Sequence, residues 1–229
     1  GLAADGDRFE HTYVGLGTSV AEKQVVAVAL YGSALRVGFG SAGGWSAFGP
    51  ERLVTASSGN VLRTLDAEPA LALYKRYLGD ASGDLPASAL LFPLALNRVD
   101  SSAPVVRTIL AVDEALGTLT FAADIPEGAR VRLMRASINS LVGGAEGAAR
   151  MALDRLGRAP SVAILVSCVG RRLVLKQRVE DELDGVRQIL GNASVMAGLY
   201  SYGEITPLAP SCCSELHNQT MTVTLFSEC

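Results

Sequence analysis

A carboxylate and a guanidinium occur in two polar segments and could together bind a zwitterion. Glu204 follows Gly203 between two tyrosines and an isoleucine, and Arg171 ends the segment Ser167–Arg171. A carboxylate accepts hydrogen bonds from an ammonium group, and a guanidinium binds a carboxylate through two parallel bonds. The pair would therefore suit an amino acid or a similar polar metabolite. The structural alternative is that Glu204 caps a neighbouring strand and that Arg171 pairs with surface acids.

Three aromatic residues could form the walls of such a site. Tyr200 and Tyr202 are two positions apart, so in an extended chain their side chains point to the same side. Trp45, the sole tryptophan, stands beside glycines. Packing explains all three equally well, because half-buried strands favour tyrosine and a lone tryptophan is commonly a core residue. Both interpretations stay open from the sequence.

A cysteine and a histidine raise the question of nucleophilic catalysis. Cys168 and His217 could form a thiol–imidazole pair with Glu204 orienting the ring, which would make the chain a cysteine-dependent hydrolase. Their spacing does not test this idea, because such groups meet in space. The alternative is that Cys168 is a small buried residue at a strand end, and that His217 and Asn218 hydrogen-bond the backbone of a turn. Since the segment around Cys168 matches no known nucleophile motif, we expect no catalytic residues.

The same residues give weak indications of metal or cofactor binding. Cys212, Cys213 and His217 could suggest zinc, but adjacent cysteines do not easily share a tetrahedral site. Haem needs one good axial ligand, which His11 or His217 could supply, although no haem-attachment motif is present. The sequence therefore predicts no metal and no cofactor, with haem kept as an alternative.

The composition is that of a chain able to form a hydrophobic core. The 229 residues are 49% hydrophobic, so intrinsic disorder is not expected. Lys and Arg number 20 against 23 Asp and Glu, and the arginines are scattered. Nucleic-acid-binding proteins normally show a clustered basic surface. The composition thus argues against DNA and RNA as partners.

Nothing in the sequence predicts insertion into a membrane. The longest apolar runs, Val25–Leu30 and Ala89–Leu96, are far shorter than the roughly 20 residues of a spanning helix, and we interpret them as buried strands. No signal peptide is visible, although the chain opens at Gly1 and reads like a fragment. All four cysteines follow residue 167 and form no disulfide framework. This usage favours a cytoplasmic location.

Hydrophobic periodicity predicts an α+β fold with mixed or antiparallel sheets flanked by helices, in two subdomains. Helices are expected from an Asp66 cap to Gly79, over 138–156 and over 179–190. Strands are expected at 23–30, 34–39, 90–96, 105–112, 118–122, 130–134, 162–166 and 221–226, the first two joined as a hairpin. The polar segment Asn97–Pro104 predicts a boundary between domains 1–98 and 99–229.

Several motifs resemble those of the FIST family of sensory domains. The specific ones lie in the second half: SCVGR at Ser167–Arg171, YSYGEI at Tyr200–Ile205 and HNQT at His217–Thr220, preceded by IPEGA at Ile125–Ala129. Individually weaker ones lie in the first half: GLAADG at Gly1–Gly6, GGW at Gly43–Trp45, Pro69–Leu71 and FPL at Phe92–Leu94. On this resemblance, residues 1–98 correspond to the end of a FIST N-terminal domain and 99–229 to a FIST C-terminal domain.

The resemblance implies a cytoplasmic, bacterial-type module of signal transduction that binds a small ligand and has no established enzymatic activity. Amino acids have been proposed as ligands in the family, and some members are described as haem-binding nitric-oxide sensors. A signalling protein or domain would be the partner. We expect the ligand site to include Trp45, Cys168, Arg171, Tyr200, Tyr202, Glu204, His217 and Asn218. Replacing Glu204 or Arg171 by Ala should then abolish binding and leave the melting temperature nearly unchanged.

Overall fold

The computed structural model describes residues 1–97, 104–207 and 213–228, which form two compact units. The first unit comprises Gly1–Gly44 and the chain from Ile138 onward, and the second comprises Trp45–Ser137. The domain boundary expected between residues 98 and 99 falls outside the described residues and stays a prediction.

The first unit is built on a four-stranded mixed sheet in the order β13-β12-β16-β3. Its strands are β3 (Leu35–Ala42), β12 (Val162–Cys168), β13 (Val195–Ser201) and β16 (Met221–Glu228). β12 and β13 run parallel, while β16 is antiparallel to both β12 and β3. The parallel pair is joined through α3 (Val169–Leu175), the 3-10 turn η3 (Lys176–Arg178) and α4 (Val179–Leu190). Such a crossover brings the carboxyl ends of β12 and β13 to the same edge of the sheet.

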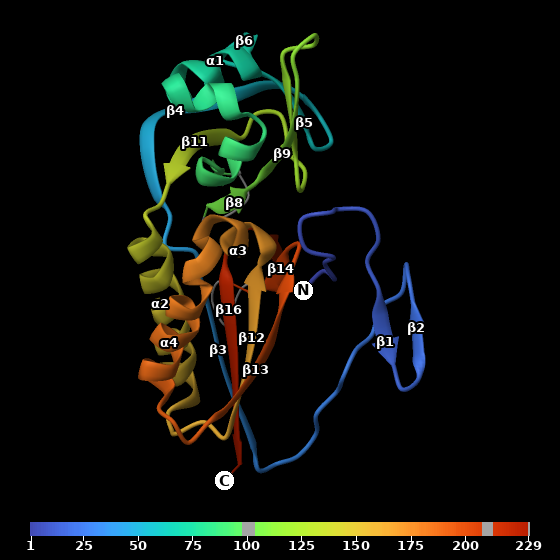
Figure 1. Ribbon diagram of the computed structural model, residues 1–229, viewed down its shortest axis with the longest axis vertical. Helices are drawn as coiled ribbons and strands as arrows, with labels where there is room; N and C mark the ends of the chain where they lie inside the picture. Colours follow the sequence, from blue (N-terminus) through green and yellow to red (C-terminus); the bar gives the residue numbers. More distant parts are fainter. Residues whose placement is uncertain (98–103, 208–212, 229) are drawn as a thin grey trace. The chain divides into compact units, whose positions relative to one another are not determined.

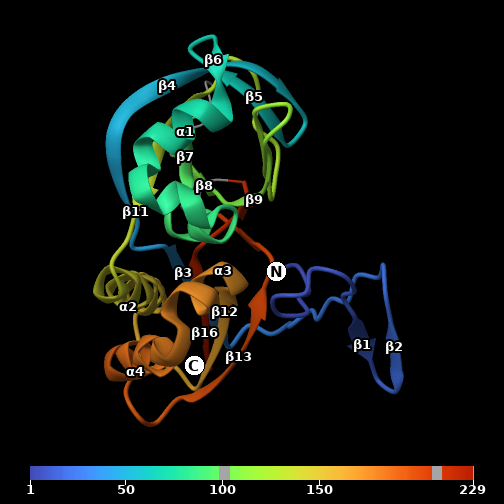
Figure 2. The same cartoon turned by 45° about the horizontal axis from the view of Figure 1, so that its top comes forward.

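Helices α2 (Ile138–Leu156) and α4 cover one face of this sheet (Figures 1 and 2). The buried face of α2 is mostly alanine, which lets the backbone of β3 approach closely. A Cβ atom added at Gly40 would lie 2.1 Å from the carbonyl oxygen of Ala148, and one at Gly38 would lie 2.1 Å from that of Ala152. The glycines of β3 therefore set the distance between helix and sheet.

Two small sheets complete the first unit. One is the hairpin of β1 (Val14–Leu16) and β2 (Ser19–Ala21), and the other pairs β14 (Glu204–Thr206) with β15 (Glu215–His217). The strand predicted over 23–30 is wrong: residues 24–32 have no regular structure, and Val25 is 96% exposed. The pattern is strand-like, but no neighbouring strand pairs with it in the described chain.

The second unit holds an eight-stranded antiparallel sheet in the order β8-β7-β11-β4-β5-β10-β9, with β6 paired to β5. Its strands are β4 (Ser46–Ser58), β5 (Val61–Leu65), β6 (Glu68–Pro69), β7 (Leu94–Asn97), β8 (Val105–Arg107), β9 (Ile109–Asp113), β10 (Thr118–Phe121) and β11 (Arg130–Arg135). β4 bends strongly (Figure 2), and its pairing with β5 shifts register on both sides of Ala56. Register shifts of this kind curve a strand and let the sheet wrap around a core.

The core of the second unit forms between this sheet and α1 (Ala70–Leu78), which is followed by the 3-10 turns η1 (Gly79–Asp84) and η2 (Ala87–Leu91). Gly79 ends α1 as expected. The Asp66 cap is wrong, because Pro69 occupies the N-cap position and no side chain caps the helix. Asp66 instead accepts hydrogen bonds from the backbone N–H of Leu53 and from Arg52.

The predicted α+β class, with mixed and antiparallel sheets flanked by helices, is confirmed. The helices expected over 138–156 and 179–190 and the strands expected at 162–166 and 221–226 are present, and the helix expected from Asp66 to Gly79 is present with a later start, at Ala70. Among the helices of the described chain, none has the length and apolar character needed to span a bilayer.

Candidate functional site

Polar residues gather where the two parallel strands of the first unit end. β12 ends at Ser167 and Cys168, and β13 ends at Tyr200 and Ser201. The turn before β16 joins them, because the backbone N–H of Cys168 donates to the carbonyl of Thr220 at 3.1 Å. Ligands of α/β sheets commonly bind beside the carboxyl ends of parallel strands. This edge is therefore the natural place to look for a site.

Glu204 lies at this edge with only 1% of its surface exposed. Ser201 Oγ donates to its Oε1 at 2.6 Å, and Thr220 Oγ1 donates to its Oε2 at 2.7 Å. No ion pair to Glu204 occurs among the described residues, although the more distant positive charge of Arg171 favours its ionised form. Burial raises the pKa of Glu204 to about 7, against the opposing effect of the two hydroxyl donors. The site thus contains a buried carboxyl that can exchange a proton near neutral pH.

Arg171 is fully buried and forms an ion pair with the equally buried Glu182 of α4. Its Nε donates to Glu182 Oε1 at 2.8 Å, and Ser167 Oγ donates to Glu182 Oε2 at 3.1 Å. The remaining N–H groups of Arg171 donate to three carbonyl oxygens, those of Gly43 (2.5 Å), Leu141 (2.8 Å) and Gln219 (3.4 Å).

This arrangement favours the structural alternative for Arg171. Its donors are already used inside the protein, so none is directed at a ligand carboxylate. The expected pairing with surface acids is wrong in one respect, because the partner Glu182 is buried. Arg171 therefore ties α3 to α4, to α2 and to the turn before β16.

Cys168 is buried at the end of β12, as the structural alternative predicted. Burial raises the pKa of its thiol to about 12, and the negative charge of nearby Glu204 acts in the same direction. A nucleophilic cysteine needs a lowered pKa, because the thiolate is the reactive form. The environment of Cys168 therefore disfavours a cysteine-dependent hydrolase.

We predict that iodoacetamide at pH 7 leaves Cys168 unmodified in the folded protein. The neutral, buried thiol should react only after unfolding, whereas the exposed Cys213 should react in both states. Peptide mass spectrometry with and without denaturant measures both residues in one experiment. Rapid native modification of Cys168 would show that its thiolate forms at neutral pH and would restore the hydrolase hypothesis.

His217 and Asn218 are both buried, at the end of β15 and in the turn that follows it. The Nε2 of His217 lies 3.1 Å from the carbonyl oxygen of Thr206, and Asn218 Nδ2 donates weakly to the carbonyl of Tyr202 at 3.5 Å. Oδ1 of Asn218 is buried and has no hydrogen-bond partner in the part of the chain that the structure describes. It is an acceptor that a ligand donor or a water could satisfy.

Both histidines considered as haem ligands make a contact within the protein. His217 makes its contact with Thr206 from inside a strand pair, and Nδ1 of His11 lies 3.0 Å from Glu22 Oε1 in an exposed pair. Within the described residues there is also no group of three or more His, Cys, Asp or Glu side chains placed to hold a metal ion. Cys212, considered for zinc, lies outside the described residues.

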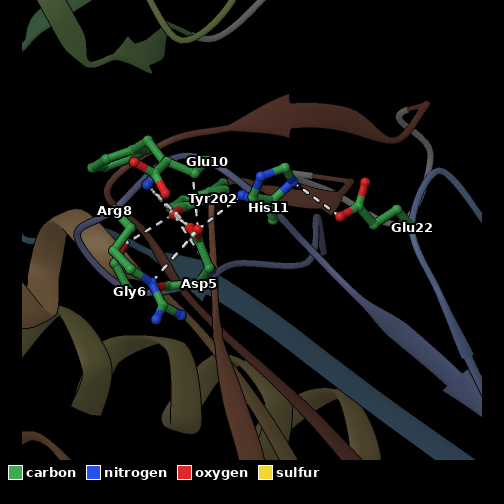
Figure 3. A network of polar contacts seen from close by, with 8 residues as sticks. Asp5, Gly6, Arg8, Glu10, His11, Glu22 and Tyr202 are labelled. Carbon is green, nitrogen blue, oxygen red and sulfur yellow. Dashed lines mark hydrogen bonds and ion pairs between the residues drawn. The ribbon is translucent and has the colours of Figure 1, made fainter.

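Tyr202 holds the N-terminal segment (Figure 3). Its hydroxyl donates to the carboxylate of Asp5, and its ring stacks on Phe9 with ring centroids 4.6 Å apart. Asp5 also accepts hydrogen bonds from the backbone N–H groups of Phe9, Glu10 and His11. The Tyr202 hydroxyl, followed by the backbone N–H groups of His11 and Glu10, lowers the pKa of Asp5. The chain bends at Tyr202, directly after β13, so the two tyrosines do not lie on one extended strand.

Tyr200 lines a pocket of about 360 Å³ between β13 and α4. The walls are mostly apolar side chains: Leu165, Leu183, Met196, Ala197, Leu199 and Met221. Its polar lining comes from Ser167, Glu182, Asp184, Arg187 and Tyr200, and Gly198 completes it. Small-molecule sites typically combine a volume of this order with a few placed polar groups.

The pocket shares only Tyr200 with the residues expected from the sequence. Arg171, Cys168, Glu204, His217 and Asn218 lie in the buried polar region around the ends of β12 and β15, and Tyr202 contacts the N-terminal segment. The partly buried Trp45 belongs to the second unit. The sequence does not single out Asp184 and Arg187, because they are two of several charged residues on α4 and such charges usually form the solvated face of a helix. The signal that could have indicated the pocket is Ser167, a polar residue at the end of an otherwise apolar strand.

Comparison with known proteins identifies the family. A model of the FIST N domain matches residues 1–68, and a model of the FIST C domain matches residues 70–207. Comparison with curated proteins and comparison with solved structures each gave no significant match. The two family matches together cover most of the chain and include the segments at the ends of β12 and β13. The chain therefore belongs to the FIST family, whose domains are described as sensory domains of signal transduction.

Proposed function

We propose that this chain is a non-catalytic sensory module that binds a small polar metabolite, such as an amino acid, in the pocket between β13 and α4. Binding of the ligand would be relayed to a signalling protein or domain. The observation that carries the proposal is a pocket that runs along β13, reaches the carboxyl ends of β12 and β13 at Ser167 and Tyr200, and includes Glu182 of the buried polar network.

The chemistry of the pocket supports a zwitterionic ligand with an apolar side chain. Asp184 and Arg187 both lie on α4 and line the pocket, so one acidic and one basic group occur together. Nη1 of Arg187 donates to the carbonyl of Ser194 at 2.6 Å, so a ligand would bind through the other N–H groups of the guanidinium. An ammonium group would pair with Asp184 and a carboxylate with Arg187. The apolar walls would then enclose the remainder of the ligand. This role is the one that the sequence assigned to Glu204 and Arg171.

The buried network supplies a means of relaying occupancy. Glu182 lines the pocket and is bonded to Arg171, which in turn holds α2, α3 and the turn before β16. A ligand that binds one arrangement of α4 more tightly than another would shift the protein toward the first arrangement. The size of this shift is set by the difference between the two affinities. The free thiols of Cys168 and Cys213 support the cytoplasmic location that we include in the proposal.

A thermal-shift screen against amino acids and related metabolites tests the proposal. A ligand that binds the native state alone stabilises it by about 2.7 kcal/mol at a hundredfold excess over its Kd. This corresponds to a rise in Tm of several degrees for a chain of this size. Calorimetry on the wild type and on Asp184→Ala should then give a Kd that is about 10 to 100 times weaker in the variant, since a charge-assisted hydrogen bond is lost.

Glu180→Ala is the matched control, because Glu180 is an exposed acid of the same helix that does not line the pocket. It should bind as the wild type does. A screen without any saturable shift would contradict the proposal, and equal affinities for Asp184→Ala and Glu180→Ala would place the ligand elsewhere.

A further inference from the structure

The outer edge of β13 is unprotected along most of its length. Just beyond its carboxyl end it is covered by the N-terminal segment, because the N–H of Tyr202 donates to the carbonyl of Leu2 and the N–H of Leu2 donates to that of Gly203. Among the described residues β13 pairs only with β12, and its sequence VMAGLYS carries no charge and no proline. Val195 is 64% exposed and Leu199 is 54% exposed. Natural proteins protect such edges with charges, prolines, bulges or covering segments, because unpaired backbone groups otherwise recruit another strand. The edge of β13 is therefore suited to strand addition.

Strand addition also fits the pocket, which lies at this same edge. Residues from both faces of β13, Met196 to Tyr200, contribute to its lining, together with Leu183 and Asp184 of α4. Leu183 is 41% exposed. A strand added beside β13 would place alternate side chains over the open side of the pocket.

The chain itself carries a segment with the properties of the missing strand. Residues Gln24–Leu30 read QVVAVAL, a run rich in β-branched and apolar residues. Val25 is 96% exposed and Val28 is 83% exposed. Backbone hydrogen bonds to this run are absent from the described part of the chain. An apolar run of this kind is unfavourable in water and gains free energy by joining a sheet.

The run of the same copy could keep all seven residues beside the outer edge of β13 only if its connection to β3 were fully extended. The run continues into β3, the opposite edge strand of the four-stranded sheet. A strand added beside β13 would lie four strand spacings from β3, which is about 19 Å. The five residue steps from Leu30 to Leu35 span at most about 18 Å when fully extended. They include a turn in which the N–H of Leu35 donates to the carbonyl of Gly32.

We propose that residues Gln24–Leu30 of a second copy of this chain add as a strand to the outer edge of β13. Each copy has one such run and one such edge, so the exchange can be reciprocal and close around a two-fold axis. The added strand supplies the outer wall of the pocket between β13 and α4. The dimer therefore forms independently of the ligand and completes the pocket in which it would bind.

Size-exclusion chromatography with light scattering tests the proposal on the whole chain. The wild type should have twice the chain mass of 23.9 kDa. Ala27→Pro/Val28→Pro should be monomeric. Every second N–H group of a strand faces its neighbour, so one of these two adjacent prolines removes an N–H that would bond to β13. Val195→Lys/Leu199→Lys should be monomeric because it charges the edge of β13. Leu110→Lys/Leu116→Lys, which changes two exposed leucines of the second unit, should remain dimeric.

Mixing the two monomeric variants separates strand exchange from other interfaces. The proline variant retains an intact β13 edge and the lysine variant retains an intact run, so an equimolar mixture should form a heterodimer with one exchanged strand. Circular dichroism verifies that both variants are folded, which is expected because all four positions lie on the surface. A monomeric wild type, dimeric variants, or a mixture that stays monomeric would each overturn the proposal.

Discussion

Glu182→Ala should lower the free energy of unfolding by about 3–5 kcal/mol, the usual cost of leaving one charge of a buried ion pair without its partner. Arg171 is fully buried, so its guanidinium would lose the carboxylate that balances its charge. Ser167 would lose its acceptor as well. Urea denaturation at pH 7, followed by circular dichroism, measures the change.

Glu180→Ala serves as the control, since it removes an exposed acid from the first turn of the same helix. Its effect should stay within about 0.5 kcal/mol, as for most surface substitutions. Arg171→Ala should be as destabilising as Glu182→Ala, which reverses the expectation drawn from the sequence. Wild-type stability in either variant of the pair would show that Arg171 and Glu182 do not hold the two helices together.

The sequence predicted those elements whose signal is contained within the element itself. α2, α4, β12 and β16 have strong helical or strand periodicity and were located almost to the residue. The run 23–30 has an equally good strand pattern and is nevertheless unpaired. Hydrophobic periodicity reports which residues prefer burial, but it does not report whether a partner strand is available.

The candidate site was harder to predict because its contacts join distant segments. The motif segments around Cys168, Tyr200 and Glu204 do meet at one edge of the sheet, as strand order requires. The partner of Arg171 could not be identified, because Glu182 looks like one of several charges on a solvated helix. The role of each charged residue depends on its burial, which follows from packing between elements.

The stability of the protein should fall as the pH rises from about 4.5 to about 7, and Glu204→Gln should remove most of this dependence. The pKa of Glu204 is about 7 in the folded state against 4.5 for an ordinary glutamate, so the folded state binds more protons in this range. Stability is therefore greatest below the lower value and is lost as Glu204 ionises. The shift corresponds to about 3 kcal/mol, because one pKa unit is worth 1.36 kcal/mol.

The amide that Glu204→Gln introduces preserves the shape of the side chain and the hydrogen bonds at this position. Ser201 and Thr220 can donate to its oxygen or accept from its nitrogen, since a hydroxyl does both. Urea denaturation at pH 5 and pH 8 should show the variant more stable than the wild type at pH 8 and close to it at pH 5. Glu180→Gln, at an exposed position, should follow the wild type at both values. A wild type and a Glu204→Gln variant with parallel pH profiles would mean that Glu204 is ionised throughout. The buried carboxyl would then play no part in any response of this domain to pH.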